Sequence, residues 1–198
     1  MGCGPPGGEH HQLDDEEPRI RLVTLNDGTP VPTRRITPDD APALQLFHLK
    51  LSNYSVYLRH IHALPRLSDN QARYFTDLKE AERFAIVALD PEDQSEIIAV
   101  VRFEGSIGST RAEYAALVTD AWQGRGLGSA LTRDLIQVAR QRGVTCLYAT
   151  VLPENVRMLG LLRDLGLPER LRFEDGVAEV ELDLTGAGDS EPEALARQ

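Results

Sequence analysis

The chain has 198 residues, the size of one domain with or without tails at roughly 100–200 residues per domain. Its 21 Lys and Arg against 31 Asp and Glu give a formal net charge of −10, which argues against a general nucleic-acid-binding protein, because such a protein needs a basic face. No stretch approaches the ~20 apolar residues of a membrane helix, and Cys3 and Cys146 make a poor disulfide framework, so we expect no membrane contact and a reducing, cytoplasmic compartment.

The two ends of the sequence differ from its middle. Residues 1–33 hold six acidic and two basic side chains, and residues 185–198 are also acidic. Both segments contain Gly and Pro and show no apolar periodicity, so they bury too little apolar surface to offset the entropy of ordering. We therefore predict flexible acidic segments on both sides of one folded domain over residues 34–184. A short strand over residues 19–25 is the alternative for part of the first segment.

Helix and strand signals alternate within the predicted domain. Thr37 followed by Pro38 and two acids is a helix start, and Ser68 with Gln71 three residues later forms a capping box. The expected elements, in chain order, are helices over 37–51 and 68–79, strands over 84–89, 97–103 and 113–119, a helix over 129–142, a strand over 144–151, a helix over 154–165, and strands over 171–173 and 177–184. This order predicts an α/β (α+β) fold with a mixed sheet and flanking helices, not a regular βαβ repeat.

A glycine-rich loop over residues 123–128 lies between a predicted strand and a predicted helix. Its glycines let the backbone turn several N–H groups toward one point and admit a phosphate without Cβ clashes. The helix that begins near Ser129 adds free N–H groups and the positive end of its dipole, and Arg125 adds a charge at the rim. A Walker loop is excluded because no Gly-Lys-Ser/Thr follows, and a dinucleotide site is weak because Ser129 replaces the third glycine. The glycines alone leave open an ordinary turn.

The residues around this loop resemble a known signature. Gln123-Gly124-Arg125-Gly126-Leu127-Gly128 fills the fixed positions of the acyl-CoA pyrophosphate motif of GNAT N-acetyltransferases. Asn155, with Gly166-Leu167 eleven and twelve residues later, matches the second motif of that superfamily. The resemblance extends over about residues 34–184. It implies a single GNAT-like domain with a mostly antiparallel central sheet whose strands splay apart at an acyl-CoA site.

The resemblance also implies which residues bind acetyl-CoA. The pantetheine arm would lie between the strands over 114–119 and 144–151 and bond to main chain near residues 117–119, the pyrophosphate would sit on residues 123–129, and no metal is needed. The residues expected to contact acetyl-CoA are Leu117, Val118, Thr119, Gln123, Gly124, Arg125, Gly126, Leu127, Gly128, Ser129 and Asn155.

Acetyl transfer to an amine requires a base. A lysine of pKa ~10.4 is charged at pH 7, and deprotonating it costs about 4.6 kcal/mol. Glu113 begins the strand that would carry the CoA arm, so its carboxylate is the candidate general base, and burial would make it a more useful one. The alternative is a solvated glutamate at the strand edge.

A narrower resemblance supports this assignment. Glu113-x-Ala115, the stretch Ser52-x-x-Ser55-x-Tyr57-x-Arg59 and Asn155-x-x-Met158 are similar to bacterial Pat-type protein lysine acetyltransferases. That resemblance implies a glutamate base at position 113 and a protein lysine as acceptor, with an acyl-CoA synthetase as candidate partner. We expect a monomer or weak dimer that binds neither nucleic acid nor a membrane.

Several positions depart from the family pattern. Leu162 stands where many GNAT enzymes have a tyrosine that protonates the leaving thiolate, and Tyr148 is a remote substitute. His60 replaces a usual aromatic residue, and His60-x-His62 on an extended segment is a weak metal candidate. Trp122 is expected to pack beneath the loop. A small-molecule amine N-acetyltransferase and a non-catalytic acyl-CoA-binding module remain the alternative functions.

Overall fold

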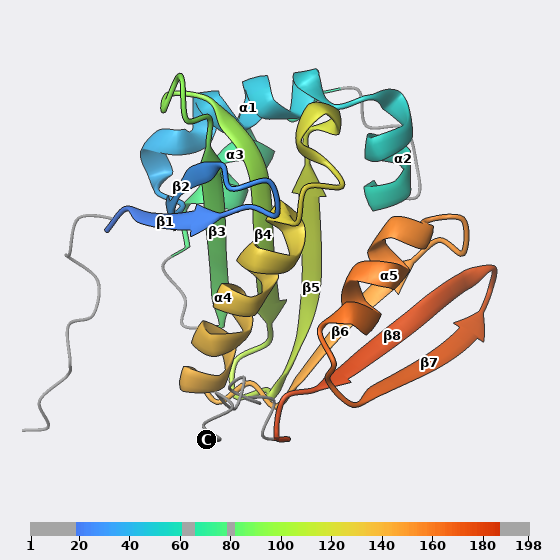
Figure 1. Cartoon of the computed structure of the whole chain (residues 1–198). Coiled ribbons are helices and arrows are strands. Elements are labelled where there is room, and N and C mark those ends of the chain that lie inside the picture. Colours follow the sequence, from blue (N-terminus) through green and yellow to red (C-terminus); the bar gives the residue numbers. More distant parts are fainter. Residues whose placement is uncertain (1–18, 61–65, 79–81, 187–198) are drawn as a thin grey trace, which may run out of the picture.

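One eight-stranded sheet organises the chain in a computed structural model, which describes residues 19–60, 66–78 and 82–186 (Figure 1). The strands lie in the order β1-β2-β3-β4-β5-β6-β8-β7. Their bounds are β1 Arg21–Thr24, β2 Pro30–Arg35, β3 Arg83–Leu89, β4 Ile97–Gly105, β5 Arg111–Val118, β6 Cys146–Val151, β7 Glu169–Glu174 and β8 Val177–Asp183. Within the described residues, all neighbouring strands run antiparallel except β5 and β6. The mixed, mostly antiparallel sheet expected from the sequence is confirmed.

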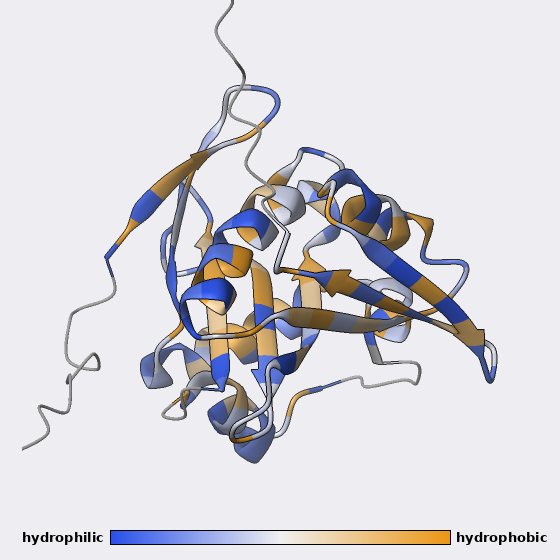
Figure 2. Cartoon of the chain, turned by 90° about the horizontal axis from the view of Figure 1, so that it is seen from below, coloured by the Kyte–Doolittle hydropathy of each residue, from blue (hydrophilic) through white to orange (hydrophobic). Residues whose placement is uncertain are grey.

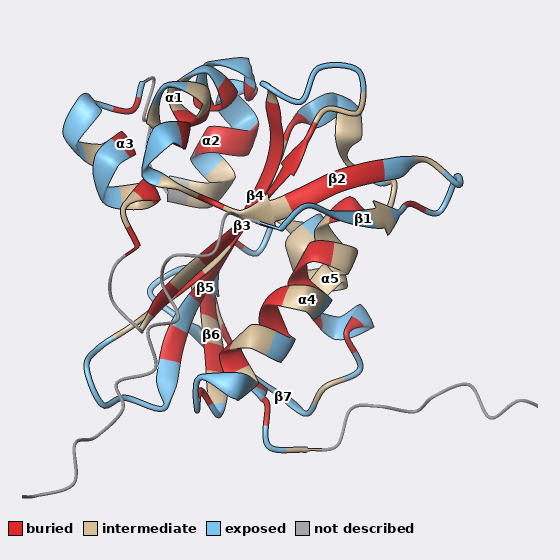
Figure 3. Cartoon of the chain, turned by 90° about the vertical axis from the view of Figure 1, so that its left-hand side faces the viewer, coloured by how far each residue is buried: buried red, intermediate tan, exposed pale blue. Residues whose placement is uncertain are grey.

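Helices cover both faces of this sheet. They are α1 Ala41–Lys50, α2 Asn53–His60, α3 Asp69–Thr76, α4 Leu127–Gln141 and α5 Val156–Asp164, with short 3-10 turns at Pro38–Asp40 and Asp120–Trp122. Figure 3 shows α1, α2 and α3 on one side of the strands and α4 with α5 on the other. No helix in the described ranges is long and apolar enough to cross a membrane.

The central strands are buried on both faces. Along β3, Ile86 and Ala88 face the layer with α4, whereas Ala85, Val87 and Leu89 face the layer with α1 and α3. Successive side chains of a strand point to opposite faces, so a strand between two helical layers needs a continuous apolar run rather than an alternating one. Figure 2 shows these apolar strands between the helices, whereas the outer β7–β8 hairpin alternates in polarity.

Strands β5 and β6 pair over a short distance and then separate. Arg111, Ala112 and Glu113 lie opposite Cys146, Leu147 and Tyr148 in parallel register. Beyond this point β5 continues to Val118, while β6 diverges from β5 and stays paired with β8 (Figure 1). The splayed strands implied by the family resemblance are therefore present, and Glu113 lies on the last paired rung.

Two elements differ from the sequence prediction. Strands β1 and β2 belong to the sheet, so the folded domain begins before residue 34 and includes part of the predicted flexible segment; the alternative strand over residues 19–25 is confirmed. Residues 53–60 form the helix α2, where no helix was predicted from the sequence. His60 was expected on an extended segment, and it is instead the last residue of this helix. Residues 1–18 and 187–198, which include most of the predicted tails, lie outside the described residues.

An ion pair fixes the entry to α1. Both oxygens of Asp40 accept hydrogen bonds from the Arg34 guanidinium at 2.7 Å, and Oδ2 also accepts the N–H of Thr37 at 2.7 Å. The Asp40 side chain is 9% exposed. Burial opposes ionisation, yet these hydrogen bonds outweigh it and hold the pKa of Asp40 below its ordinary value. The pair ties β2 to the start of the first helical layer.

Asp40→Asn is expected to lower the free energy of unfolding at pH 7 by about 3 kcal/mol, because it leaves a buried Arg34 without its counter-charge. Since the pKa of Asp40 is depressed in the folded state, its stabilisation is complete above the unfolded value of about 3.9 and is lost as pH falls through the folded pKa. Urea unfolding between pH 7 and pH 3 measures both. Asp39→Asn at the exposed neighbour is the control, expected within about 0.5 kcal/mol of wild type.

Candidate active site

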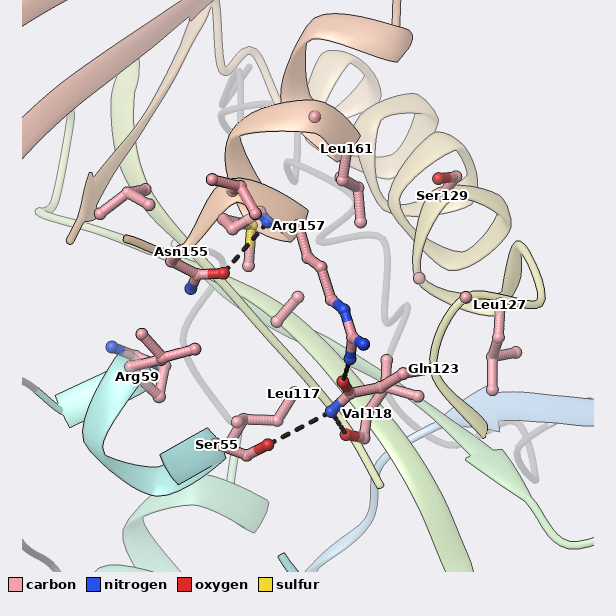
Figure 4. A pocket seen from close by; sticks show the side chains of 18 of the residues that line it. Ser55, Arg59, Leu117, Val118, Gln123, Leu127, Ser129, Asn155, Arg157 and Leu161 are labelled. Atoms are coloured by element: carbon pink, nitrogen blue, oxygen red, sulfur yellow. Dashed lines mark hydrogen bonds between the residues drawn. The ribbon is translucent and has the colours of Figure 1, made fainter. Parts of the chain in front are cut away.

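A cleft of about 760 Å³ opens where β5 and β6 separate. Its walls come from β5, β6, α2, α5 and the glycine-rich loop that leads into α4. Figure 4 shows Leu117 and Val118 along one wall, with Asn155 and Arg157 facing them from the start of α5. Nine of the eleven residues expected to contact acetyl-CoA line this cleft: Leu117, Val118, Gln123, Gly124, Gly126, Leu127, Gly128, Ser129 and Asn155. Thr119 and Arg125 do not.

The edge of β5 that faces the cleft carries main-chain groups that, among the described residues, no neighbouring strand pairs; of these, the Val118 carbonyl accepts a hydrogen bond from the Gln123 side chain at 2.9 Å. The N–H of Thr119 donates to the carbonyl of Ile98 at 2.9 Å, and directly opposite residues of an antiparallel pair alternate between bonded and non-bonded rungs. In the register of β4 and β5, Leu117 therefore directs its main chain toward β4, whereas Val118 and Ala116 direct theirs into the cleft. This corrects the expectation for Leu117 and Thr119, whose main-chain groups point away from the cleft.

The glycine-rich loop bends through left-handed backbone conformations. Gly124 has φ +74° and Gly126 has φ +87°, values that cost a residue with a Cβ about 1–2 kcal/mol. Helix α4 begins immediately afterwards at Leu127, so its first N–H groups face the loop region. Gly128 lies in the first turn of α4, and a Cβ there would come within 3.0 Å of Leu161 on α5. The loop thus presents a helix N-terminus to the cleft.

The cation that reaches this loop is Arg157, and Arg125 points elsewhere. Arg125 pairs with Asp27 at 2.7 Å, donates to Thr29 at 2.9 Å and stacks its guanidinium over the Trp122 ring at 4.3 Å. It holds the β1–β2 turn against the loop instead of facing the cleft. Arg157, from the first turn of α5, lines the cleft and donates a hydrogen bond to the side-chain oxygen of Gln123 (Figure 4).

Asn155 both caps α5 and faces the cleft. Its Oδ1 accepts the N–H of Met158 at 3.1 Å, which leaves the side-chain NH₂ group as a donor toward the cleft (Figure 4). Capping with a short amide side chain fixes where the helix starts. The residue therefore serves two roles that the sequence motif alone did not separate.

Glu113 lies at the closed end of the splay. It stands opposite Tyr148 on β6 and opposite Glu104 on β4. Its side chain is exposed, so the chain by itself does not provide the burial that the sequence argument assumed for a catalytic base. Arg59 on α2 is close enough for the Glu113 carboxylate to favour its charged form. Tyr148, the remote candidate acid, packs against the guanidinium of Arg111 at 4.0 Å and does not line the cleft.

Comparison with known proteins identifies the family. Residues 44–167 match the model of the Acetyltransferase (GNAT) family. This chain belongs to the GNAT acetyltransferase family. The GNAT domain of S. lividans PAT shares 37% identity with it at a TM-score of 0.76, over 83% of this chain and 96% of that domain. The chain is therefore an N-acetyltransferase of a single GNAT fold, and its likeness to Pat-type enzymes is confirmed.

Two curated sequences named as acetyltransferases are also similar to this chain. Acetyltransferase PA5475 of Pseudomonas aeruginosa is 28% identical over 146 residues, which cover 73% of this chain and 78% of the relative. Acetyltransferase Pat of Mycolicibacterium smegmatis is 30% identical over 131 residues, or 59% of this chain. That match spans 39% of the length of the Mycolicibacterium protein, so the activity of the whole relative is not carried over directly.

In this acetyltransferase, one carboxylate joins α2 to the glycine-rich loop. Asp120 accepts the N–H of Ser52 at 3.0 Å and the hydroxyls of Ser52 and Ser55 at 2.9 and 3.0 Å. Gln123 in turn donates to the Ser55 hydroxyl at 3.3 Å and to the Val118 carbonyl at 2.9 Å. The serines of the Pat-like stretch therefore link α2 to the loop, and Ser55 also lines the cleft.

Asp120→Ala is expected to weaken acetyl-CoA binding about fivefold, because it removes the three hydrogen bonds from Ser52 and Ser55 to this carboxylate and leaves only the Gln123–Ser55 bond between α2 and the loop, at about 1 kcal/mol net. Ser52→Ala removes only the hydroxyl contribution and is expected to have a smaller effect. Titration calorimetry with acetyl-CoA measures both variants. Equal affinities for Asp120→Ala and wild type would show that the network does not position the loop.

Several residues that line the cleft were not predicted from the sequence, among them Asn26, Tyr54 and Arg157. Asn26 comes from the β1–β2 turn, Tyr54 from α2 and Arg157 from α5. Arg157 lies two residues after the motif residue Asn155, a spacing that could have indicated it, whereas Asn26 and Tyr54 reach the cleft only through tertiary contacts.

The structure also shows where the remaining candidates lie. Trp122 was expected to pack beneath the loop; it packs partly against the core, stacks with the Arg125 guanidinium and also lines the cleft. Cys146 is a free, partly buried cysteine. His60 ends a helix, and His62 lies outside the described residues. In the part of the chain that the structure describes, no three His, Cys, Asp or Glu side chains gather to hold a metal ion.

Proposed function

We propose that this acetyltransferase transfers the acetyl group of acetyl-CoA to a lysine ε-amine of a protein, with Glu113 as general base. The observation that carries the proposal is the cleft that follows the free edge of β5 and ends at the rung of Glu113. A donor held along that edge brings its thioester to the level of this carboxylate. A cytoplasmic acyl-CoA synthetase is the candidate substrate, because the chain is similar to Pat enzymes.

In this proposal acetyl-CoA extends along the cleft from the glycine-rich loop to the strand pairing at Glu113. The pantetheine amides would pair with the main chain of Ala116 and the N–H of Val118, as an added strand does; the Val118 carbonyl accepts from Gln123. The pyrophosphate would meet the glycine-rich loop, the start of α4 and the guanidinium of Arg157. The amide of Asn155 would contact the pantetheine from the opposite wall. This arrangement uses no metal ion.

The chemistry is direct transfer. Glu113 takes a proton from the lysine ammonium, directly or through a water molecule, and the neutral amine attacks the thioester carbonyl. A C–N bond forms, the C–S bond breaks with its electron pair leaving on the CoA thiolate, and the proton that the attacking nitrogen then loses passes through water to that thiolate. Leu162 is fully buried and offers no acid, so water is the proposed proton source for the thiolate.

The exposure of Glu113 favours a large acceptor. A folded protein surface placed over the end of β5 excludes water from the reacting groups better than a small amine does. Exposed Tyr54 and Tyr57 on α2 flank the cleft, at 58% and 39% exposure, and aromatic side chains are enriched at protein interfaces. We therefore place the protein acceptor against α2 and the end of β5.

The test measures CoA-thiol release from acetyl-CoA with a purified acyl-CoA synthetase and, in parallel, with a panel of small amines. Release with the folded synthetase, traced by mass spectrometry to one lysine and lost when that lysine is replaced by Arg, is expected. CoA-thiol release with a small amine alone would show that the acceptor is a small molecule and not a protein. Acetyl-CoA binding without release to any acceptor would leave a binding module.

A further inference from the structure

A small inner pocket adjoins the acyl end of the cleft. Its volume is about 50 Å³, room for about two water molecules at ~30 Å³ each. It lies between the sheet and the helices α1 and α3, and its walls are mostly apolar. The side chains of Arg59 and Arg102 are the exceptions that carry charge. Arg59, Ala115, Ala116 and Leu117 line both the inner pocket and the cleft, so the two spaces share a wall along β5.

The positive charge of Arg102, which lines this pocket, is only partly balanced by a nearby carboxylate. Its side chain is 12% exposed and its guanidinium stacks on the Phe75 ring at 4.3 Å. The nearest carboxylate oxygen, of Glu104, is 4.0 Å away, and that carboxylate also serves Arg83 at 3.5 Å and the Tyr74 hydroxyl. Within the described residues, the buried Nη2 of Arg102 has no hydrogen-bond partner.

Among the described residues that line the pocket, Arg59 and Arg102 are basic and none is an Asp or Glu. Arg59 makes no hydrogen bond or ion pair with the residues described, and Glu113 is the first carboxylate that acts on it. Glu104, the carboxylate nearest Arg102, lies outside the lining and also contacts Arg83. Burial, together with the charges of Arg83 and Arg59, lowers the pKa of Arg102 to about 10 despite Glu104. Arg102 is still a cation at neutral pH. His48, also on the wall, has its pKa lowered by burial.

We propose that the inner pocket binds the terminal carboxylate of a short dicarboxylic acyl group carried on CoA, so that the enzyme also transfers acyl groups of the malonyl or succinyl class. This inference rests on the proposed binding of acyl-CoA in the cleft. The transfer balances as acetyl transfer does: the amine forms the C–N bond, the thioester C–S bond breaks and CoA leaves with the electron pair. The distal carboxylate is unchanged and pairs with Arg102 and Arg59.

We assign this carboxylate to the acyl-CoA donor and not to the acceptor, because of the position of the β5 residues that line both the cleft and the inner pocket. A pantetheine arm paired with Val118 and Ala116 runs toward Glu113, so an acyl group held at the level of Glu113 lies next to Ala115, which is two residues away on the same face of β5 and lines both spaces. The acceptor amine must instead approach the exposed side of Glu113. The small volume limits the acyl group to a few carbons, and the apolar walls suit its methylenes.

Binding experiments test this without any acceptor. Titration calorimetry compares succinyl-CoA, acetyl-CoA and CoA on the full chain. Wild type is expected to bind succinyl-CoA at least as tightly as acetyl-CoA. Arg102→Met is expected to weaken succinyl-CoA about tenfold relative to acetyl-CoA, the scale of a lost charge-assisted hydrogen bond. Arg59→Gln is a second variant at a more accessible site. Arg172→Met, on the exposed strand β7, removes the same charge away from the pocket and is expected to keep the wild-type ratio.

The outcomes separate this inference from the proposed function. Acetyl-CoA binding with a succinyl-to-acetyl ratio that neither arginine substitution changes would overturn the carboxylate pocket and leave the proposed function standing. Failure of all three CoA ligands to bind would overturn the proposed function itself. A carboxylate-bearing amine whose KM rises in Arg102→Met, at an unchanged donor ratio, would move the carboxylate to the acceptor and overturn the donor assignment.

Discussion

Replacing Glu113 by Gln is expected to lower kcat for acetyl transfer by about 100- to 10,000-fold, the usual contribution of a positioned general base. Glutamine keeps the size and polarity of the side chain but cannot accept the ammonium proton. Because Glu113 is exposed on the last paired rung of β5 and does not line the cleft, the fold and the donor site are expected to be unaffected. The loss should therefore appear in kcat and not in the dissociation constant of acetyl-CoA.

Steady-state rates of thiol release across pH 6–10, together with acetyl-CoA titrations, measure this effect. A variant without a base should regain activity as pH approaches the pKa of free lysine, ~10.4. Glu174→Gln, at the exposed end of β7, is the matched control and should retain the wild-type kcat. Turnover of Glu113→Gln close to wild type at saturating acceptor would show that a water molecule or another group removes the proton.

Local signals, together with the family resemblance, were sufficient to predict most of the architecture and most of the expected donor-site residues that line the cleft. The glycine pattern at 123–128 needs specific backbone conformations, and Gly124 and Gly126 adopt them. Asn155 was identifiable because a helix cap is a local feature, and the structure shows it as one. Both motifs depend on contacts within a few residues, which a sequence pattern records directly.

Features that depend on distant pairings were not predictable in this way. Arg125 lies in the motif itself, yet its charge is neutralised by Asp27, nearly a hundred residues earlier in the chain. A strand at β1 was only the alternative prediction, because β1 is four residues long, and β2 was missed because it contains two prolines. The inner pocket depends on Arg59 and Arg102, which α2 and β4 bring together. Arg59 belongs to the Pat-like stretch, but no pattern in the sequence of β4 indicates that Arg102 lies beside it.

The β1–β2 turn also sets the expected result for Gly126→Ala. Gly126 has φ +87°, and a Cβ there would lie 2.7 Å from Oδ1 of Asn26, a residue of that turn that lines the cleft. The substitution should therefore strain the loop by about 1–2 kcal/mol and also displace Asn26. Acetyl-CoA affinity is expected to fall at least about tenfold, because the loop must keep its shape to place its N–H groups on a phosphate.

A matched substitution separates strain from function. Gly143 follows the end of α4 with φ +79° and open space around its Cβ position. Gly143→Ala should lower the melting temperature through the same left-handed strain but leave acetyl-CoA affinity unchanged. Gly124→Ala, at φ +74° with no clash, should fall between the two in affinity. Gly126→Ala could lose stability as Gly143→Ala does and still bind acetyl-CoA as wild type does. The loop would then be a structural turn, and the phosphates would have to bind elsewhere, with Arg157 as the remaining charged anchor.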